Sequence, residues 1–244
     1  MNGAPRLSGH REPLGLWRHR AGPPAELPDL RAERIEFTSR GDRATGRLWL
    51  PRTPGGELPL VLLQHRAGSS ASSEVAALAA RFARLGAAVA AIDLALHGAR
   101  SDAKLGALLA RALAGERGAA PDALLEEFVR QSIVDLERCL DALCTLPELD
   151  AGRVAYAGFG LGARLGAVFC SLDPRVHAVA LALDDAADPI PGLDARAFAA
   201  RIAPRPLLWL GDTGSRQSRA PGAEADPAEE TLRFLAPLLG LRPA

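Results

Sequence analysis

The chain has 244 residues, 48% of them hydrophobic and 24% charged, and its 29 basic residues balance its 29 acidic ones. This composition is typical of one sizeable globular domain and excludes intrinsic disorder. A formal net charge of zero offers no positive field to a polyanion, so we expect neither a nucleic acid nor a membrane as partner. No apolar stretch reaches the roughly 18 residues of a membrane-spanning helix, and no apolar leader follows Met1, so we expect a cytoplasmic protein.

The first third of the chain predicts an extension followed by the start of a sheet. Residues 1–31 contain Pro, Gly and Arg without a regular hydrophobic period, so we expect an N-terminal extension, with a short helical turn near Leu14 to Trp17, before a domain of residues 32–244. Two runs of strand-forming residues joined across residues 40–43 predict an antiparallel hairpin. The apolar run at 58–64 is typical of a strand buried on both faces.

Apolar and amphipathic segments then alternate to the end of the chain. Helices are expected at residues 72–86, 103–115, 121–144, 161–171, 194–201 and 227–240, and strands at 88–94, 153–159, 176–183 and 206–211. This alternation predicts an α/β fold, in which helices cover both faces of a mostly parallel sheet of about seven strands. Any functional site is expected at the carboxyl ends of these strands.

Three segments carry motifs of a known family. LPLVLLQHRAGSS (58–70) is a strand with a polar loop, IDLALHGARS (92–101) contains the pattern D-x-x-x-H-G-x-S, and GFGLG (158–162) joins a strand to a helix. Over roughly residues 30–240 the chain resembles the α/β-hydrolase superfamily, closest to its dienelactone-hydrolase-like and acyl-peptidase-like esterases. The resemblance implies a three-layer sandwich and places the pocket and oxyanion loop at His65, Arg66, Ala67, Gly68, Ser69, Phe159, Gly160 and Leu161.

The resemblance also implies a Ser-Asp-His triad, which is not found at its expected positions. The family presents its serine in G-x-S-x-G, whereas this chain has Gly160 at the nucleophile position. The acid position falls on Gly214, with Asp212 two residues away. About 15 residues without a histidine lie between Gly211 and Pro227, so the base position and the family's eighth strand are both missing.

These observations favour a hydrolase-fold pseudoenzyme that keeps a pocket for an unknown small molecule or protein, with no cofactor and no metal site expected. Glycine suits such an elbow, because it adopts positive φ without the strain that a serine bears there. The sequence does not determine the oligomeric state.

The first alternative is a degenerate esterase or dienelactone-type hydrolase, with a catalytic set relocated to His97, His65, Asp184 and Asp212. These residue types supply general acids, bases and metal ligands, and they follow the carboxyl ends of predicted strands. In the competing interpretation, both histidines are turn residues that bond the backbone. Ser69 and Ser70 are a further surrogate for the nucleophile, although no histidine is placed to act as their base.

The second alternative is a dinucleotide-binding protein. Gly158-x-Gly160-x-x-Ala163 follows a strand and fits the fingerprint G-x-G-x-x-G/A, with Asp184 and Asp185 about 20 residues further on. That motif normally opens its domain, whereas only about 80 residues follow it here.

Overall fold

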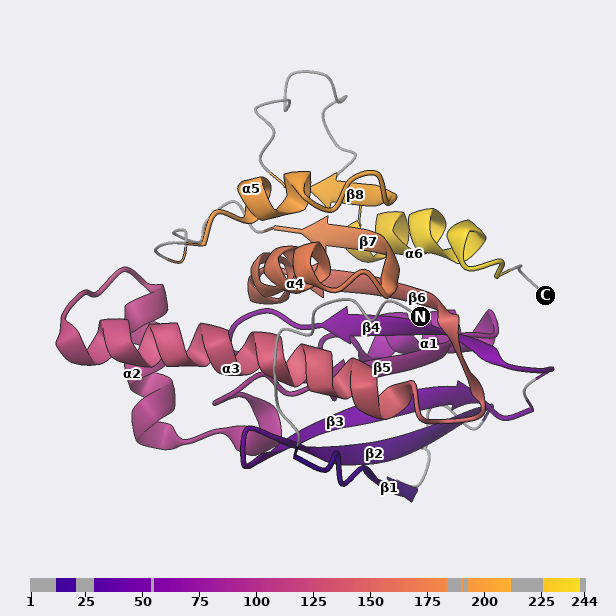
Figure 1. The fold of residues 1–244 in the computed structure, drawn as a ribbon, viewed down its shortest axis with the longest axis horizontal. Helices are drawn as coiled ribbons and strands as arrows, with labels where there is room; N and C mark the ends of the chain where they lie inside the picture. Colours follow the sequence, from indigo (N-terminus) through magenta and orange to yellow (C-terminus); the bar gives the residue numbers. More distant parts are fainter. Residues whose placement is uncertain are drawn as a thin grey trace.

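The computed structural model describes residues 12–20, 29–53, 55–183, 190, 193–211 and 226–241. One eight-stranded sheet runs through it, with helices on both faces (Figure 1). The strands are β1 (Trp17–Arg20), β2 (Leu30–Ser39), β3 (Asp42–Pro51), β4 (Leu58–Gln64), β5 (Ala88–Ile92), β6 (Leu149–Phe159), β7 (Val176–Ala182) and β8 (Leu207–Leu210). The helices are α1 (Ala76–Arg84), the 3-10 turn η1 (Gly98–Arg100), α2 (Ala103–Leu113), α3 (Ala119–Leu143), α4 (Leu161–Leu172), α5 (Ala195–Ala200) and α6 (Pro227–Leu238).

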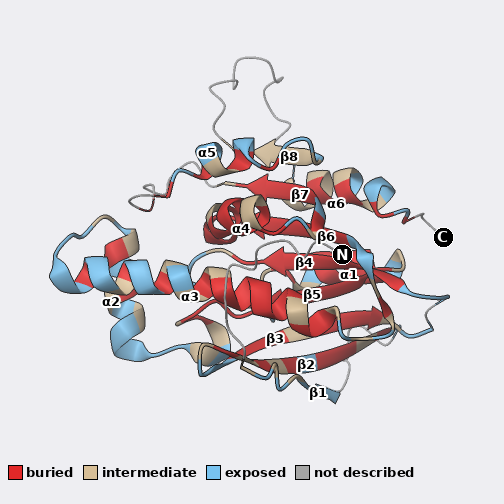
Figure 2. Ribbon diagram, viewed as in Figure 1, coloured by how far each residue is buried: buried red, intermediate tan, exposed pale blue. Residues whose placement is uncertain are grey.

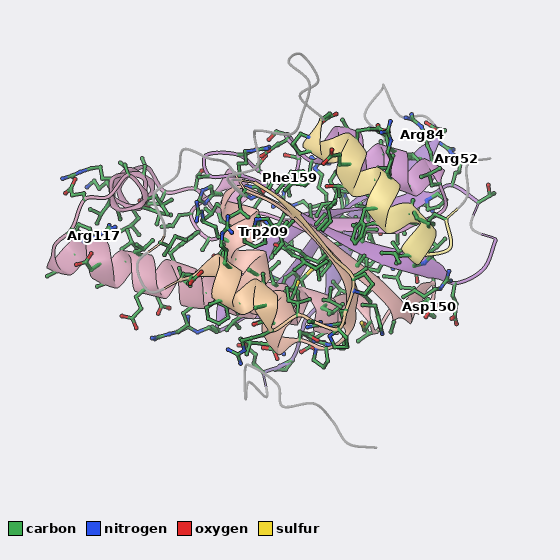
Figure 3. The ribbon with its side chains drawn as sticks, turned by 90° about the horizontal axis from the view of Figure 1, so that it is seen from above. Arg52, Arg84, Arg117, Asp150, Phe159 and Trp209 are labelled. Atoms are coloured by element: carbon green, nitrogen blue, oxygen red, sulfur yellow. The ribbon has the colours of Figure 1, made fainter. Side chains whose placement is uncertain are left out.

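The strand order is β1-β2-β3-β5-β4-β6-β7-β8. The pairs from β1 to β5 are antiparallel, and β5, β4, β6, β7 and β8 pair in parallel. The carboxyl ends of the parallel strands therefore meet at one edge of the sheet. In the view from above, Asp150 near the start of β6 and Phe159 at its end mark this direction, and Arg117 lies farther out (Figure 3). The predicted α/β architecture is confirmed.

Side chains of the central strands alternate between two hydrophobic cores. All seven residues of β4 are buried. Leu60 and Leu62 join the core that includes residues of α2, α3, α4 and α5, whereas Val61 and Leu63 join the core that includes α1 and α6. A strand covered on both faces favours apolar residues, which explains the uninterrupted run over residues 58–63. Gln64, the polar residue at its end, donates to the Ile92 carbonyl at 2.7 Å. The result is the predicted three-layer sandwich, with its buried centre visible in Figure 2.

The N-terminal segment differs from its prediction. The helical turn expected near Leu14 to Trp17 is not found: residues 13–16 have no regular secondary structure, and residues 17–20 form an antiparallel edge strand, β1, which pairs with residues 33–36 of β2. Arg18 fixes it through ion pairs to Glu33 and Glu148, both at 2.7 Å. An edge strand tolerates charged residues because only one of its sides is paired. This strand raises the number of strands from the expected seven or so to eight. The residues where the family's last strand is expected to be missing, 212–225, lie outside the described part.

Two other predictions of local structure are also corrected. Helix α1 begins at Ala76 rather than near Ser72, and its N-cap residue, Val75, provides no side-chain cap. The hydroxyl of Ser72 instead lies 3.3 Å from that of Ser70. The strand ending in Gly158 does not open a nucleotide-binding sheet, because β6 is the sixth strand along the chain and lies between β4 and β7.

Helix α3 buries polar and charged residues as well as apolar ones. Asp135 is fully buried and accepts from the Arg100 guanidinium at 2.5 Å and from the Gln131 side chain at 2.7 Å. Arg138 donates to the carbonyl of Thr38 at 3.2 Å. Buried charges are tolerated when they are paired and hydrogen-bonded, so these contacts attach α3 to the end of β2 and to η1.

Close packing of α4 on β6 yields a stability prediction. A Cβ at Gly166 would lie 2.1 Å from the Tyr156 ring, whereas a Cβ at Gly106 in α2 would meet nothing nearer than 3.9 Å. Gly166→Ala is therefore expected to lower the free energy of unfolding by about 1–3 kcal/mol through overpacking. Gly106→Ala is expected to raise it by about 0.5–1 kcal/mol through helix propensity. Urea unfolding of both variants tests this, and a stabilising Gly166→Ala would contradict the packing.

Candidate functional site

The turn between β6 and α4, where the resemblance implies a nucleophile elbow, has glycine at its tip. Gly160 has φ 51° and ψ −110° and is the N-cap residue of α4. A Cβ at Gly158 would lie 2.5 Å from the Gly162 carbonyl, and a Cβ at Gly162 would lie 2.6 Å from the Gln64 oxygen. Both flanking positions therefore require glycine, because the strand, the helix and the end of β4 approach one another at backbone distance.

Hydrogen bonds attach this elbow to its neighbours. The Gly160 N–H donates to the Ala182 carbonyl at the end of β7, at 2.7 Å. The Gly162 N–H donates to the His65 carbonyl at 3.1 Å, and the Tyr156 hydroxyl donates to the Gly162 carbonyl at 2.6 Å. The elbow is thus held between β7 and the loop after β4, which is the loop predicted to supply the oxyanion contacts.

His65 is fully buried, and backbone groups occupy both of its ring nitrogens. Nε2 accepts from the Leu94 N–H at 3.3 Å, so the proton is on Nδ1, which donates to the Arg66 carbonyl at 2.7 Å. Burial lowers the pKa of the imidazole, and nearby His97 acts in the same direction, although the Arg66 carbonyl opposes them. His65 is therefore a neutral bridge between two loops, as the turn-residue interpretation predicts. Action as a surrogate base would require the ring to give up one of these two hydrogen bonds.

His97 is also a turn residue. Its Nδ1 donates to the Ala95 carbonyl at 2.8 Å, and only 8% of the residue is exposed. The ring centroid lies 5.5 Å from that of His65 and 5.8 Å from that of Phe128. Aromatic packing on two sides and a backbone bond hold this ring in one orientation.

The loop after β4 carries an ion pair that the sequence did not reveal. The Arg66 N–H donates to Glu74 at 2.9 Å, the Arg66 guanidinium pairs with the same carboxylate, and the guanidinium lies 5.4 Å from the centre of the Phe159 ring. Ala67 and Gly68 are exposed, and the Ser69 hydroxyl lies 3.2 Å from that of Ser73. No local pattern marks Glu74, because it meets Arg66 through the folding of the loop.

Asp93 joins this loop to the D-x-x-x-H-G motif. One carboxylate oxygen accepts from the Ala71 N–H at 2.9 Å, and the other accepts from the Ala99 N–H at 3.1 Å and from the Thr45 hydroxyl at 3.2 Å. A Cβ at Gly98, whose φ is +55°, would lie 2.2 Å from this carboxylate. The motif therefore organises the backbone around a buried charge.

No family model and no curated protein matches this sequence. Among solved structures, a cold-adapted esterase from an Arctic intertidal metagenomic library is similar with a TM-score of 0.60 and 21% identity, over 79% of this chain and 76% of that one. The chain has the α/β-hydrolase fold.

Acetyl xylan esterases of the same fold are similar over less of their length. Those from Paenibacillus sp. R4 and Thermoanaerobacterium sp. JW/SL YS485 have TM-scores of 0.56 and 0.55 and identities of 21% and 20%, each over 69% of this chain. The chain spans about half of their length, 53% and 52% respectively. At these identities the likeness concerns the fold, and function depends on the site.

The position at which the sequence resemblance implies a nucleophile, Gly160, lies at the turn between β6 and α4. The other triad positions are not described: Asp184, Asp212 and the acid position Gly214 lie outside the described residues, as does Asp185. Among the residues that are described, no group of three or more His, Cys, Asp or Glu side chains could hold a metal ion. None of the described helices combines the length and apolar character needed to cross a membrane.

Two cavities lie near the carboxyl edge of the sheet. The smaller one, of about 80 Å³, lies beside the elbow between the loop after β4 and the start of α6, where Arg66, Glu74, Phe159 and Asp226 line it. The larger one, of about 440 Å³, lies between α3, α4 and α5, and we name it the α3–α5 groove. Its described lining residues are Asp122, Leu125, Glu126, Val129, Ile133, Val168, Ile190, Leu193 and Phe198.

The buried, neutral His65 yields a pH prediction. Its pKa is lower in the folded state than the value near 6.5 of an unfolded chain, so protons bind the unfolded state more tightly. The free energy of unfolding is therefore expected to fall as the pH drops below about 6.5. In His65→Asn this slope is expected to be shallower, whereas His177→Asn, at an exposed position of β7, controls for the loss of one imidazole. Equal slopes in urea titrations of all three proteins would contradict the assignment.

Proposed function

We propose that this protein is a non-catalytic member of the α/β-hydrolase fold that binds a partner or ligand and does not hydrolyse esters through a serine. The observation that carries the proposal is the elbow: Gly160 has the nucleophile's backbone conformation but no side chain. Covalent catalysis at that position needs a nucleophilic side chain, and a serine hydroxyl there must be activated by a base. Glycine leaves neither a nucleophile nor a strained residue there.

The hydrogen bonds of His65 and His97 support the same proposal. A general base needs a nitrogen within hydrogen-bond reach of the proton that it removes. Both nitrogens of His65 bond the backbone, and Nδ1 of His97 bonds the Ala95 carbonyl. To act as bases in a relocated catalytic set, these histidines would have to give up hydrogen bonds to the backbone of the loops after β4 and β5.

The size of the rate loss on removing a triad residue supports the proposal as well. Loss of the nucleophile or the base of a hydrolytic triad lowers turnover by about 10⁶-fold, and the losses are not additive because the residues act together. A residual acceleration of roughly 10³ to 10⁴ over water can remain from the oxyanion contacts and binding. A chain without these groups is expected to show no acyl-enzyme burst.

The elbow yields the third prediction, which concerns activity. Wild type, Gly160→Ser and Gly160→Ala are expected to hydrolyse p-nitrophenyl acetate at indistinguishable low rates and to resist labelling by a fluorophosphonate. Both substitutions add the same Cβ at positive φ, so the difference between them isolates the hydroxyl. A serine without a base remains a neutral, weak nucleophile at neutral pH.

The same assay tests the esterase alternative. Turnover by the wild type well above that of heat-denatured protein, together with its loss in His97→Asn, would replace the proposal with a relocated catalytic set. Asparagine can still donate to the Ala95 carbonyl, and circular dichroism establishes that the variant is folded. Strong fluorophosphonate labelling of Gly160→Ser alone would also contradict the proposal, because it would show that a working base faces the elbow.

A further inference from the structure

Helix α2 is apolar but largely exposed. Eight of its 11 residues are leucine or alanine, and its only charged residues are Lys104 and Arg111. Only Leu109 and Ala112 are buried, and Leu105 is 45% exposed. Much of the helix is accordingly pale blue in Figure 2. Contiguous exposed apolar surface is a feature of interaction sites.

Together with the start of α3, this helix forms an arm. The arm projects past the ends of the strands, and α2 crosses α3 near the arm's tip (Figure 1). Only the second half of α3, from Ser132 onward, is mostly buried against the body. The first half has an apolar stripe at Leu125 and Val129, which belongs to the α3–α5 groove.

The exposed helix and the groove have opposite charges. Lys104, Leu108 and Arg111 are spaced four and three residues apart and therefore share one face of α2. In the groove, Asp122 and Glu126 are four residues apart, beside the apolar stripe of α3. An apolar helix with basic residues thus complements an apolar groove with acidic residues, the arrangement of helix-in-groove recognition.

We propose that two copies of this chain form a symmetric dimer in which α2 of each copy lies in the α3–α5 groove of the other. Leu105 and Leu108 contact the apolar lining, and Lys104 and Arg111 face Asp122 and Glu126. A second copy fits better than another partner, because α2 and the α3 side of the groove are neighbouring parts of one arm. A single two-fold exchange fills both grooves and covers both helices.

The leucines supply the affinity and the charges supply orientation. Arg111 already pairs with Glu116, and Glu126 pairs with Arg130, in both cases between exposed side chains. Ion pairs between exposed side chains contribute little to stability, so new pairs with the second copy can replace them at small cost. Charge complementarity therefore selects the register of the docked helix, whereas burial of Leu105 and Leu108 stabilises the complex.

The fourth prediction is the first test of the dimer, measured by sedimentation equilibrium over a series of protein concentrations. The wild type is expected to reach twice the chain mass of 25.6 kDa. Leu105→Glu is expected to weaken the dimer by about tenfold or more, since a carboxylate would replace a buried leucine. Leu238→Glu is the matched control, because Leu238 in α6 is 46% exposed and lies outside the arm. A wild type that stays monomeric at every concentration overturns the proposal, as does a dimer insensitive to Leu105→Glu.

A charge exchange gives the second test. Lys104→Glu and Glu126→Lys are each expected to weaken the dimer, and the double variant is expected to restore it. Additive weakening in the double variant contradicts the docking. Binding of a monomeric wild type to anionic phosphatidylserine vesicles, lost in Leu105→Glu, would assign α2 to a lipid surface instead and overturn the dimer. These variants leave the elbow unchanged, so failure here does not affect the proposed function.

Discussion

The buried carboxylate of Asp93 is the constraint on which the site depends. It binds backbone N–H groups from the loops after β4 and after β5 and a hydroxyl on β3, so three separate segments share one acceptor. A carboxylate removed from water is stable only when such donors surround it. Gly98 is required because a Cβ there would collide with the carboxylate. The most specific motif of the sequence therefore has a structural role that does not need catalysis.

The glycines of the elbow are also explained by backbone packing and conformation alone. Gly158 and Gly162 are fixed by the approach of α4 to β6 and β4, whatever residue lies between them. At Gly160 the backbone alone sets the requirement, because its φ of 51° favours glycine over any other residue. The backbone of this turn is thus set without any side chain at residue 160, and the turn by itself does not establish an activity.

The two halves of helix α3 lie in different environments. Its second half is held by paired buried charges, above all the contact between Asp135 and Arg100, which reaches back toward the backbone of Asp93. Its first half extends beyond the body and carries the groove. The polar anchor therefore allows a long helix to project an exposed arm without losing its register against the sheet.

The sequence by itself determined the order of strands and helices from β2 onward, the two-sided burial of β4, the glycine elbow and the turn around His97. These features are local, because hydrophobic period and turn chemistry depend on neighbouring residues. Only the tertiary structure decided that residues 17–20 form a strand, that both nitrogens of His65 bond the backbone, that Glu74 pairs with Arg66, and that Asp135 meets Arg100. Such pairings depend on which polar atoms meet across segments distant in sequence, or within one folded loop, and the residue pattern does not encode them.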